Sequence, residues 1–255
     1  MPSHVLLSRS TVRFKPPRFG LGGARLGEAD EGTAIATVDA AYQAGIRFFE
    51  TSPAYGDSEA RLGAALRKRP RGEYLLSTRT LSTDPEDDVR RSSERLGQAV
   101  DLILAENPAA FTVLDRLKQD GVIKAIGAVA GDWQQLDELV QDIDLDCVFL
   151  TRHYSLLDQQ AKPLLDRCQE RGVSAIVSEA RVPETVKARS VSAVCERYGV
   201  SLAQAALAFP IRHPAVTSVL ITASSPAEIR AGAALVRRPV PERLWKDPEL
   251  LGLLS

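Results

Sequence analysis

Residues Gly121–Val140, GVIKAIGAVAGDWQQLDELV, contain the pattern that decides the fold. Ala125–Val129 is a short apolar run with the length and composition of a buried strand. Trp133–Val140 follows it with apolar residues at helical spacing. Gly121 stands before the run, where a preceding helix ends, and glycine is the usual residue at that left-handed position. The stretch therefore predicts one strand followed by one helix.

The same alternation continues from near the start of the sequence to near its end. The expected strands are Phe19–Gly22, Phe48–Phe49, Tyr74–Thr78, Leu102–Ala105, Ala125–Val129, Cys147–Leu150, Val173–Val177 and Ser218–Ile221. The expected helices are Ser58–Lys68, Pro85–Leu96, Phe111–Gln119, Trp133–Val140, Gln159–Arg171, Val186–Tyr198 and Ala227–Leu235, with a further helical turn in Leu202–Ile211 and a short last helix in Pro241–Leu254. Eight β–α units in about 250 residues predict an α/β fold of the (β/α)8 TIM-barrel type. No linker or low-complexity tract divides the sequence, so residues 1–255 are expected to form a single domain.

Composition limits the classes of function. The formal net charge of −1, from 32 basic and 33 acidic residues, gives no field that would attract nucleic acid or an anionic membrane. No run approaches the roughly 20 apolar residues that a membrane span needs, and the first residues lack the pattern of a signal peptide. We expect a cytoplasmic protein with a small-molecule substrate and no nucleic-acid or membrane partner; the oligomeric state stays open.

The cysteines indicate neither a disulfide framework nor a metal site. Cys147, Cys168 and Cys195 are odd in number, have no CxxC spacing and have no histidine at metal-ligand spacing. We expect all three to be buried free thiols.

The two ends of such a barrel have different roles. The N-terminal end serves stability, and Val5–Leu7 with Thr11–Phe14 is expected to form a hairpin that closes it. The active site lies at the C-terminal ends of the strands, so the residues directly after each strand are the informative ones. Those residues are Glu50–Tyr55, Arg79, Glu106–Asn107, Val129–Asp132, Arg152–Tyr154, Ser178–Arg181 and Thr222–Ser225.

Several motifs resemble the aldo-keto reductase superfamily, and among its branches they are most similar to the aldose and galactose dehydrogenases. The motifs are FGLGGARLG at 19–27, VDAAYQAGIRFFETSPAYG at 38–56, SEARLG at 58–63, RGEYLLST at 71–78, GVIKAIG at 121–127, YSLLD at 154–158 and YGVSLAQAAL at 198–207. The resemblance covers nearly the whole chain. It implies an eight-stranded barrel and, in the usual member, reduction by a nicotinamide cofactor.

The family's four catalytic positions are carried over one at a time. The resemblance implies that Tyr55 is the catalytic tyrosine. Glu50 stands where the family has Asp, Arg79 where it has Lys, and Glu106 where it has His. A Glu in place of that His also resembles the family's steroid double-bond reductases, in which a protonated Glu polarises the enone.

The cofactor positions also depart from the family pattern. Where the last strand of the family presents a Gly, an Arg for the adenosine phosphate and an Asn, this sequence has Thr222, Ser224 and Gly232. The position of the Asn that holds the nicotinamide carboxamide falls near Gly131. Tyr154 matches the tyrosine that stacks on the nicotinamide ring.

These residues suggest a chemistry of their own. Arg79 and Glu50 could pair as a two-nitrogen fork, because a guanidinium is planar and keeps its proton. Tyr55 beside that cation is expected to have a pKa lowered from about 10. Glu106, desolvated in the barrel mouth near Glu50, is expected to have a raised pKa and to act as a general acid or base.

Three interpretations follow. The first is an enzyme repurposed for cofactor-independent acid–base chemistry (dehydration, elimination, isomerisation or cyclisation) on a small molecule, with Tyr55, Glu106, Arg79 and Glu50 as catalytic residues, possible use in secondary metabolism and no cofactor. The alternatives are an NAD(P)H-dependent carbonyl or enone reductase with a modified site, for which NADP is the expected cofactor, and a non-catalytic small-molecule-binding barrel.

The substrate-binding candidates are four residues that follow strands or begin helices at the same end. They are Tyr154, Asn107, Trp133 and Arg152. Structural roles are open beside these: Tyr154 and Trp133 as packing residues, Arg152 as a solvated loop residue, Glu50 with Arg79 as a structural ion pair, and Glu106 as a helix cap.

Overall fold

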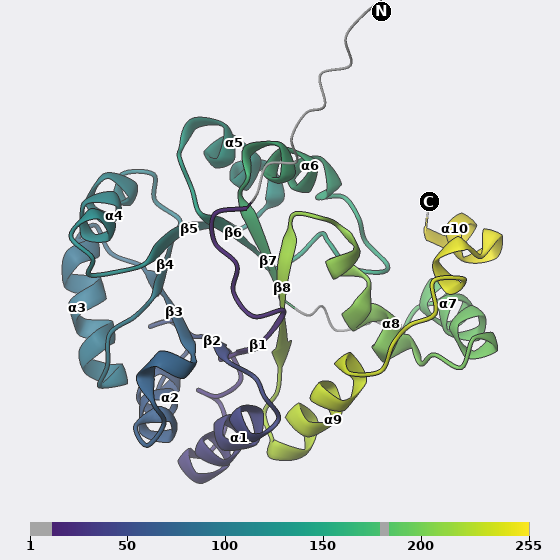
Figure 1. Cartoon of the computed structure of the whole chain (residues 1–255), viewed down its shortest axis with the longest axis horizontal. Coiled ribbons are helices and arrows are strands. Elements are labelled where there is room, and N and C mark those ends of the chain that lie inside the picture. Colours follow the sequence, from purple (N-terminus) through teal and green to yellow (C-terminus); the bar gives the residue numbers. More distant parts are fainter. Residues whose placement is uncertain (1–11, 179–183, 255) are drawn as a thin grey trace, which may run out of the picture.

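The computed structural model describes residues 12–178 and 184–254 and contains the expected barrel (Figure 1). Eight parallel strands pair in sequence order, and β8 closes on β1. The strands are β1 (Phe19–Gly22), β2 (Phe48–Glu50), β3 (Leu75–Thr80), β4 (Leu102–Ala105), β5 (Ala125–Val129), β6 (Cys147–Leu150), β7 (Ser174–Ser178) and β8 (Val216–Thr222). All eight expected strands are confirmed, with ends that differ by a few residues.

The helices surround the barrel and alternate with the strands (Figure 1). They are α1 (Glu31–Gln43), α2 (Ser58–Leu66), α3 (Pro85–Leu96), α4 (Ala110–Gln119), α5 (Trp133–Asp142), α6 (Lys162–Arg171), α7 (Val186–Arg197), α8 (Leu202–Ala208), α9 (Pro226–Val236) and α10 (Pro248–Leu254). Three short 3-10 turns are η1 (Arg71–Glu73), η2 (Pro210–Arg212) and η3 (Leu244–Lys246). The expected extra turn and last helix are confirmed as α8 with η2 and as η3 with α10.

Helix α1 is the element that periodicity did not predict. Its buried face consists mainly of small residues such as Ala34, Thr37 and Ala41, so it lacks the wide stripe of large apolar residues that marks an amphipathic helix. Asp30 caps its start by accepting a hydrogen bond from the Thr33 backbone N–H at 2.9 Å. Small side chains allow α1 to lie against both α2 and α9.

The inside of the barrel is filled by alternate residues of the strands. This inner core contains Phe48, Leu102, Leu104, Ala125, Val129, Cys147, Phe149, Ile176 and Leu220. All three cysteines are free and buried, as expected. The packed interior leaves the strand ends as the place for chemistry.

The described part of the N-terminal segment closes the end of the barrel at which the strands begin. Residues 12–18 cross this end (Figure 1), and the Arg13 N–H donates to the Gly172 carbonyl at 3.2 Å. Phe14 packs against the inner core. Residues 12–14 form no strand, and Val5–Leu7 and Thr11 of the expected hairpin lie outside the described residues.

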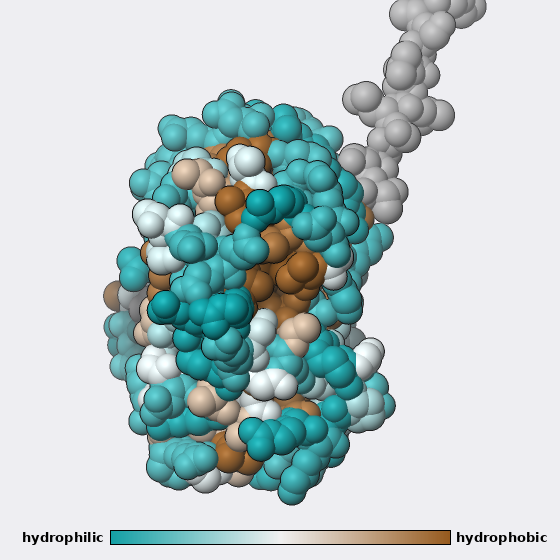
Figure 2. Space-filling model, turned by 90° about the vertical axis from the view of Figure 1, so that its left-hand side faces the viewer, coloured by the Kyte–Doolittle hydropathy of each residue, from teal (hydrophilic) through white to brown (hydrophobic). Residues whose placement is uncertain are grey.

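A groove of about 560 Å³ lies between α3 and α4, on the side of the molecule shown in Figure 2. Figure 2 shows apolar surface gathered in a hollow with polar surroundings on this side of the molecule. Val89, Leu117 and Val122 are the apolar residues that line the groove. The groove belongs to the outer helical layer and not to the strand ends. No helix among the described residues is long and apolar enough to cross a membrane.

Candidate active site

The candidate site is built at the C-terminal ends of β1, β2 and β3. In the register of the barrel, Gly22 lies beside Glu50 and Glu50 lies beside Ser77. Alternate residues of a strand face the same side, so Glu50 follows Phe48 inward and Arg79 follows Ser77. Phe48 belongs to the inner core. The Glu50 and Arg79 side chains therefore stand above that core at the mouth of the barrel.

Tyr55 is held by the turn that follows β2. Its N–H donates to the Ser52 carbonyl at 3.0 Å, and its own carbonyl accepts from the Ser58 N–H at 3.1 Å. The loop after β1 packs directly on this turn, because a Cβ on Gly27 would lie only 1.8 Å from the Tyr55 carbonyl oxygen. The Ser58 hydroxyl ties the two loops together by donating to the Gly23 carbonyl at 2.9 Å. The backbone of Tyr55 is therefore fixed from two sides.

Tyr55, Arg79 and Glu50 form one hydrogen-bonded cluster. Arg79 Nη2 donates to Glu50 Oε1 at 3.1 Å and to the Tyr55 hydroxyl, and that hydroxyl lies 3.4 Å from the same carboxylate oxygen. The Glu50 side chain is 3% exposed and that of Arg79 13%. The expected ion pair is present, but it runs through one guanidinium nitrogen in place of the expected two-nitrogen fork. The same nitrogen, Nη2, also donates to the phenol.

Aromatic rings hold the Arg79 guanidinium from two sides. Its central carbon lies 5.2 Å from the centroid of the Tyr55 ring and 5.1 Å from that of Phe149 on β6. Both distances are within the range of a cation–π contact. Arg79 Nε is buried and has no hydrogen-bond partner among the described residues. The guanidinium is thus fixed in place, and its Nε–H group remains available to donate a hydrogen bond.

The pKa values in the cluster are set first by burial. Burial raises the pKa of Glu50, against the opposing effect of Arg79. Burial and the neighbouring Glu50 carboxylate raise the pKa of Tyr55 to about 12, although Arg79 acts to lower it. The expectation of a lowered Tyr55 pKa is therefore wrong, because desolvation outweighs the cation. Tyr55 is a neutral phenol at physiological pH.

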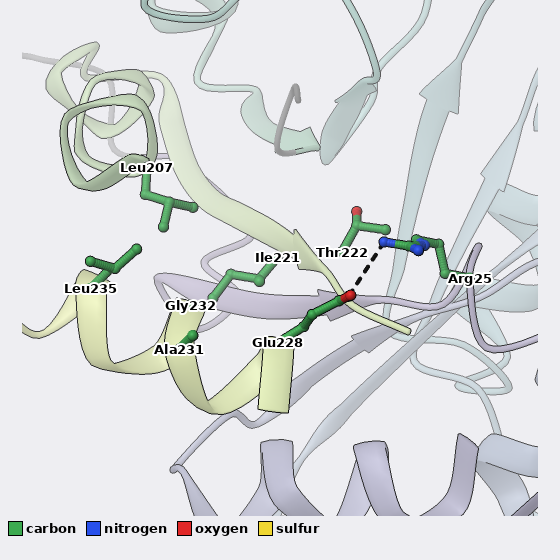
Figure 3. Close-up of a pocket in the computed structure, with 8 residues that line it drawn as sticks. All are labelled: Arg25, Leu207, Ile221, Thr222, Glu228, Ala231, Gly232 and Leu235. Carbon is green, nitrogen blue, oxygen red and sulfur yellow. Dashed lines mark hydrogen bonds and ion pairs between the residues drawn. The ribbon is translucent and has the colours of Figure 1, made fainter. Parts of the chain in front are cut away.

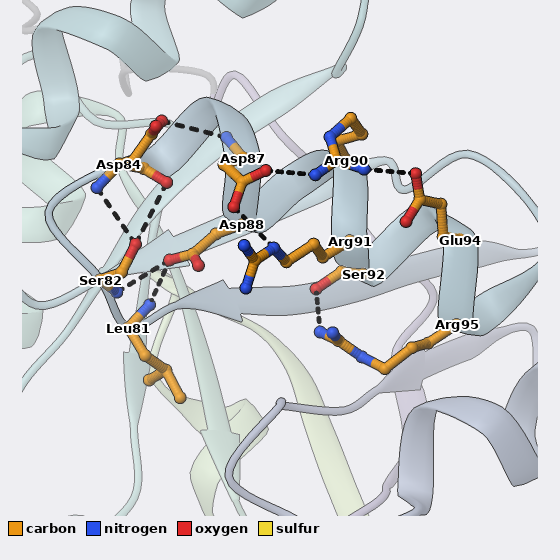
Figure 4. Close-up of polar contacts among 10 residues, drawn as sticks. All are labelled: Leu81, Ser82, Asp84, Asp87, Asp88, Arg90, Arg91, Ser92, Glu94 and Arg95. Carbon is orange, nitrogen blue, oxygen red and sulfur yellow. Dashed lines mark hydrogen bonds and ion pairs between the residues drawn. The ribbon is translucent and has the colours of Figure 1, made fainter.

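The loop after β3 is fastened to the start of α3 (Figure 4). Asp88 accepts hydrogen bonds from the backbone N–H groups of Leu81 and Ser82, both at 2.8 Å. Asp84 caps the helix by accepting from the Asp87 N–H at 3.1 Å. These contacts fix the chain directly beyond Arg79.

Behind the cluster, a buried carboxylate joins β3 to two helices. Glu59 of α2 is 1% exposed, accepts from the Thr78 hydroxyl at 2.6 Å and pairs with Arg95 of α3 at 2.5 Å. Such a bridge restrains the strand that carries Arg79.

Glu106 and Asn107 follow β4 and are both exposed. Glu106 therefore lacks the desolvation on which its expected acid–base role depended. Asn107 accepts a hydrogen bond from the Ala109 N–H at 3.0 Å and so orders the turn before α4. Residues 179–181, also expected at this face, lie outside the described part of the chain.

The other substrate-binding candidates occupy different environments. Tyr154 is 6% exposed, and its ring lies 5.7 Å from Phe209 and 6.1 Å from His213, measured between centroids. Its ring is thus used in packing, which corrects its expected role as a stacking platform. Trp133 is half-buried at the start of α5 and packs against the main core, while Arg152 is exposed.

A cavity of about 520 Å³ lies at the end of β8 (Figure 3). It is lined by Arg25, Leu207, Ile221, Thr222, Glu228, Ala231, Gly232 and Leu235. Arg25 and Glu228 were not predicted as site residues from the sequence. The pattern Ser225-x-x-Glu228, a capping box, was the signal that could have located Glu228 over the start of α9.

The residues at the strand ends fit a nicotinamide dinucleotide. The cavity is within the 300–1,000 Å³ range typical of small-molecule sites. Gly22 lies between the cavity and the cluster, where a Cβ would be 3.5 Å from Thr222 Oγ1 and 3.8 Å from Glu50 Oε2. Without a side chain at Gly22, the space between these two side chains stays open. The cavity and Tyr55 are therefore neighbours on one face.

Known proteins resemble the chain over nearly its whole length. It is 29% identical to D-threo-aldose 1-dehydrogenase from a Pseudomonas species, covering 91% of this chain and 92% of the relative. It is 28% identical to L-galactose dehydrogenase of Arabidopsis thaliana, covering 96% and 91%. A solved aldo-keto reductase of Bacillus halodurans superposes with a TM-score of 0.81 at 22% identity, covering 97% of this chain and 95% of that one. These relatives agree with the aldose and galactose dehydrogenase branch indicated by the motifs.

These names overturn the leading functional expectation. The hypothesis of cofactor-independent lyase or isomerase chemistry is wrong, because the relatives are dehydrogenases. The expectation of no cofactor is wrong with it, since side chains alone do not supply or accept a hydride. The acid–base hypothesis also depended on a desolvated Glu106 and an acidified Tyr55, but Glu106 is exposed and the pKa of Tyr55 is raised. The alternative of a nicotinamide-dependent oxidoreductase agrees better with the relatives.

A family model described as the aldo/keto reductase family matches residues 18–180, which contain β1 to β7 and the whole Tyr55 cluster. The match covers more than half of the chain. Beyond the matched residues, β8 completes the closed barrel by pairing with β1. The chain belongs to the aldo/keto reductase family.

Proposed function

We propose that this chain is an NAD(P)H-dependent reductase of carbonyl or enone compounds, with Tyr55 as its proton donor. The observation that carries the proposal is the contact between the neutral Tyr55 phenol and the Arg79 guanidinium at the strand-end face. A protonated group of this kind is what a substrate oxygen needs as it gains negative charge. Membership of the family supports the same class of reaction.

The residues of the cluster have separate roles in this proposal. When bound, a reduced nicotinamide would supply the hydride for the electrophilic carbon of the substrate. Tyr55 gives its hydroxyl proton to the substrate oxygen, so a carbonyl becomes an alcohol. Arg79 stabilises the phenolate left behind, because it is already hydrogen-bonded to that oxygen. Arg79 keeps its own proton and therefore acts as a fixed charge, not as a relay.

Glu50 is proposed as a positioning residue. Its buried carboxylate contacts both Arg79 and the Tyr55 hydroxyl, so it sets where the two meet. It also neutralises a guanidinium that would otherwise be a largely buried unpaired charge.

Substrate contacts are proposed for residues at the rim. Glu106, Asn107 and Arg152 are exposed around the strand ends, and Trp133 is half-buried. Tyr154 is left out because its ring is buried against Phe209.

The proposal is tested by offering the purified protein NADH or NADPH together with aldehydes, aldoses and enones. We expect a reduced nucleotide to bind and to be oxidised only when a suitable substrate is present, with one reduced product formed per nucleotide consumed. A protein that binds neither nucleotide contradicts the proposal, as does turnover of a substrate without any nucleotide.

A further inference from the structure

The cavity beside β8 has an apolar part and a charged mouth (Figure 3). Leu207 of α8, Ile221 of β8 and Leu235 of α9 form apolar walls. Arg25, from the loop after β1, and Glu228, from the first turn of α9, point toward each other at the other end. Such a site suits a flat apolar base with a polar sugar at its edge.

The mouth of this cavity is close to the reacting groups. Thr222 pairs with Gly22, and Gly22 pairs with Glu50. Adjacent strands lie about 4.8 Å apart, so only two strand spacings separate Thr222 from Glu50. A dinucleotide with its nicotinamide over Tyr55 has this cavity within reach of its adenosine end.

The Glu228 side chain, from the first turn of α9, turns back to the loop between β8 and α9. Its carboxylate accepts from the Ser224 N–H at 2.9 Å and from the Ser224 hydroxyl at 3.1 Å. Its own N–H donates to the Ser225 hydroxyl at 3.3 Å. Barrels often bind a phosphate after their seventh and eighth strands. In this chain a side-chain carboxylate fills that position.

The single arginine at the mouth is paired with the same carboxylate. Arg25 Nη1 lies 3.3 Å from Glu228 Oε2, and both side chains are less than half exposed. The pair is neutral overall, so it offers no excess positive charge to a phosphate. Among the described residues that line the cavity, Arg25 is the one cationic side chain.

We propose that Glu228 makes this chain select NADH over NADPH, an inference that rests on the proposed function. The two nucleotides differ at the 2′ position of the adenosine ribose, where NADH has a hydroxyl and NADPH a phosphate. A carboxylate accepts hydrogen bonds from a ribose hydroxyl and repels a phosphate dianion, which is why acidic residues mark NAD sites in other dinucleotide-binding folds. Glu228 is thus a specificity-determining residue.

The test is to titrate the protein with NADH and, separately, with NADPH, and to measure both affinities by calorimetry in the absence of substrate. NADH is expected to bind about tenfold or more tightly than NADPH, the effect of one unfavourable charge contact at a partly exposed site. In Glu228→Gln the ratio should fall to within about threefold, chiefly because NADPH binds more tightly. The Ser225 hydroxyl caps α9 by accepting the backbone N–H of residue 228, so this variant keeps the helix start. Glu249→Gln, which removes a carboxylate paired with Arg197 near the C-terminus, is the matched control and should keep the full ratio.

The outcomes separate the two proposals. If NADPH binds as tightly as NADH or more tightly, the selectivity inference is overturned and the proposed function stands. If Arg25→Gln weakens NADPH much more than NADH, Arg25 is a phosphate receptor and the inference is also overturned. If neither nucleotide binds the unmodified protein, the proposed function fails and takes the inference with it.

Discussion

At the scale of single residues, the barrel mouth shows how burial decides protonation. Tyr55 lies beside a cation, yet its pKa rises to about 12 because the phenol is desolvated and next to Glu50. Proximity to a charge could be inferred from the sequence, whereas the extent of desolvation depends on the packed loops around the residue. The direction in which the pKa of Tyr55 shifts could therefore not be predicted from the sequence.

This pKa predicts a particular pH profile. Tyr55 stays protonated up to about pH 10, so the rate of reduction at saturating substrate should not fall at neutral or mildly alkaline pH through loss of this proton. A decline is expected only as the pH approaches about 12. The measurement is kcat against pH for the unmodified protein. A fall with an apparent pKa near neutrality that disappears in Tyr55→Phe would contradict the assignment.

Glu106 gives a second prediction at this scale. Because its side chain is exposed, we expect Glu106→Gln to change KM by up to about tenfold and to leave kcat within about threefold. Steady-state kinetics with one carbonyl substrate provide the check, and Glu138→Gln, an exposed carboxyl on α5, is the control. A hundredfold loss of kcat in Glu106→Gln would show that this carboxyl takes part in proton transfer.

At the scale of elements, the site depends on the close contact of two loops. Alanine at Gly27 would place its Cβ 1.8 Å from the Tyr55 carbonyl oxygen and 2.7 Å from the carbonyl carbon, so the turn that carries Tyr55 must move. We expect Gly27→Ala to lower stability by about 1–3 kcal/mol and to reduce kcat by about a hundredfold. Chemical denaturation and steady-state kinetics measure the two effects.

Gly72→Ala provides the comparison, since a Cβ there meets nothing within 4 Å. It should change stability and rate little. Equal effects of the two substitutions would mean that the contact between the loops does not position Tyr55.

At the scale of the whole molecule, the fold was predictable and much of the site was not. Apolar runs such as Ala125–Val129 recur at intervals that a parallel barrel requires, and that topology brings Glu50 and Arg79 to one end. Helix α1 was not predicted because the residues that face its neighbours are small and give no amphipathic pattern. The contact between Arg25 and Glu228 was not predicted, because the two residues lie about 200 positions apart in the sequence and meet where β8 closes on β1. Contacts that form when the barrel closes cannot be predicted from the spacing of residues within one segment of the sequence.

The most direct test of the central claim compares Tyr55→Phe with Tyr154→Phe. Both substitutions remove one phenolic hydroxyl, from a half-buried tyrosine at 55 and a buried one at 154, but only Tyr55 contacts Arg79 and Glu50. The measurement is single-turnover oxidation of bound NADH or NADPH by a carbonyl substrate, with nucleotide affinity determined in parallel. We predict that Tyr55→Phe slows this step by about 10²–10⁴-fold at unchanged nucleotide affinity and that Tyr154→Phe retains most of the rate. A Tyr55→Phe protein that oxidises the nucleotide as fast as the unmodified chain would contradict the account.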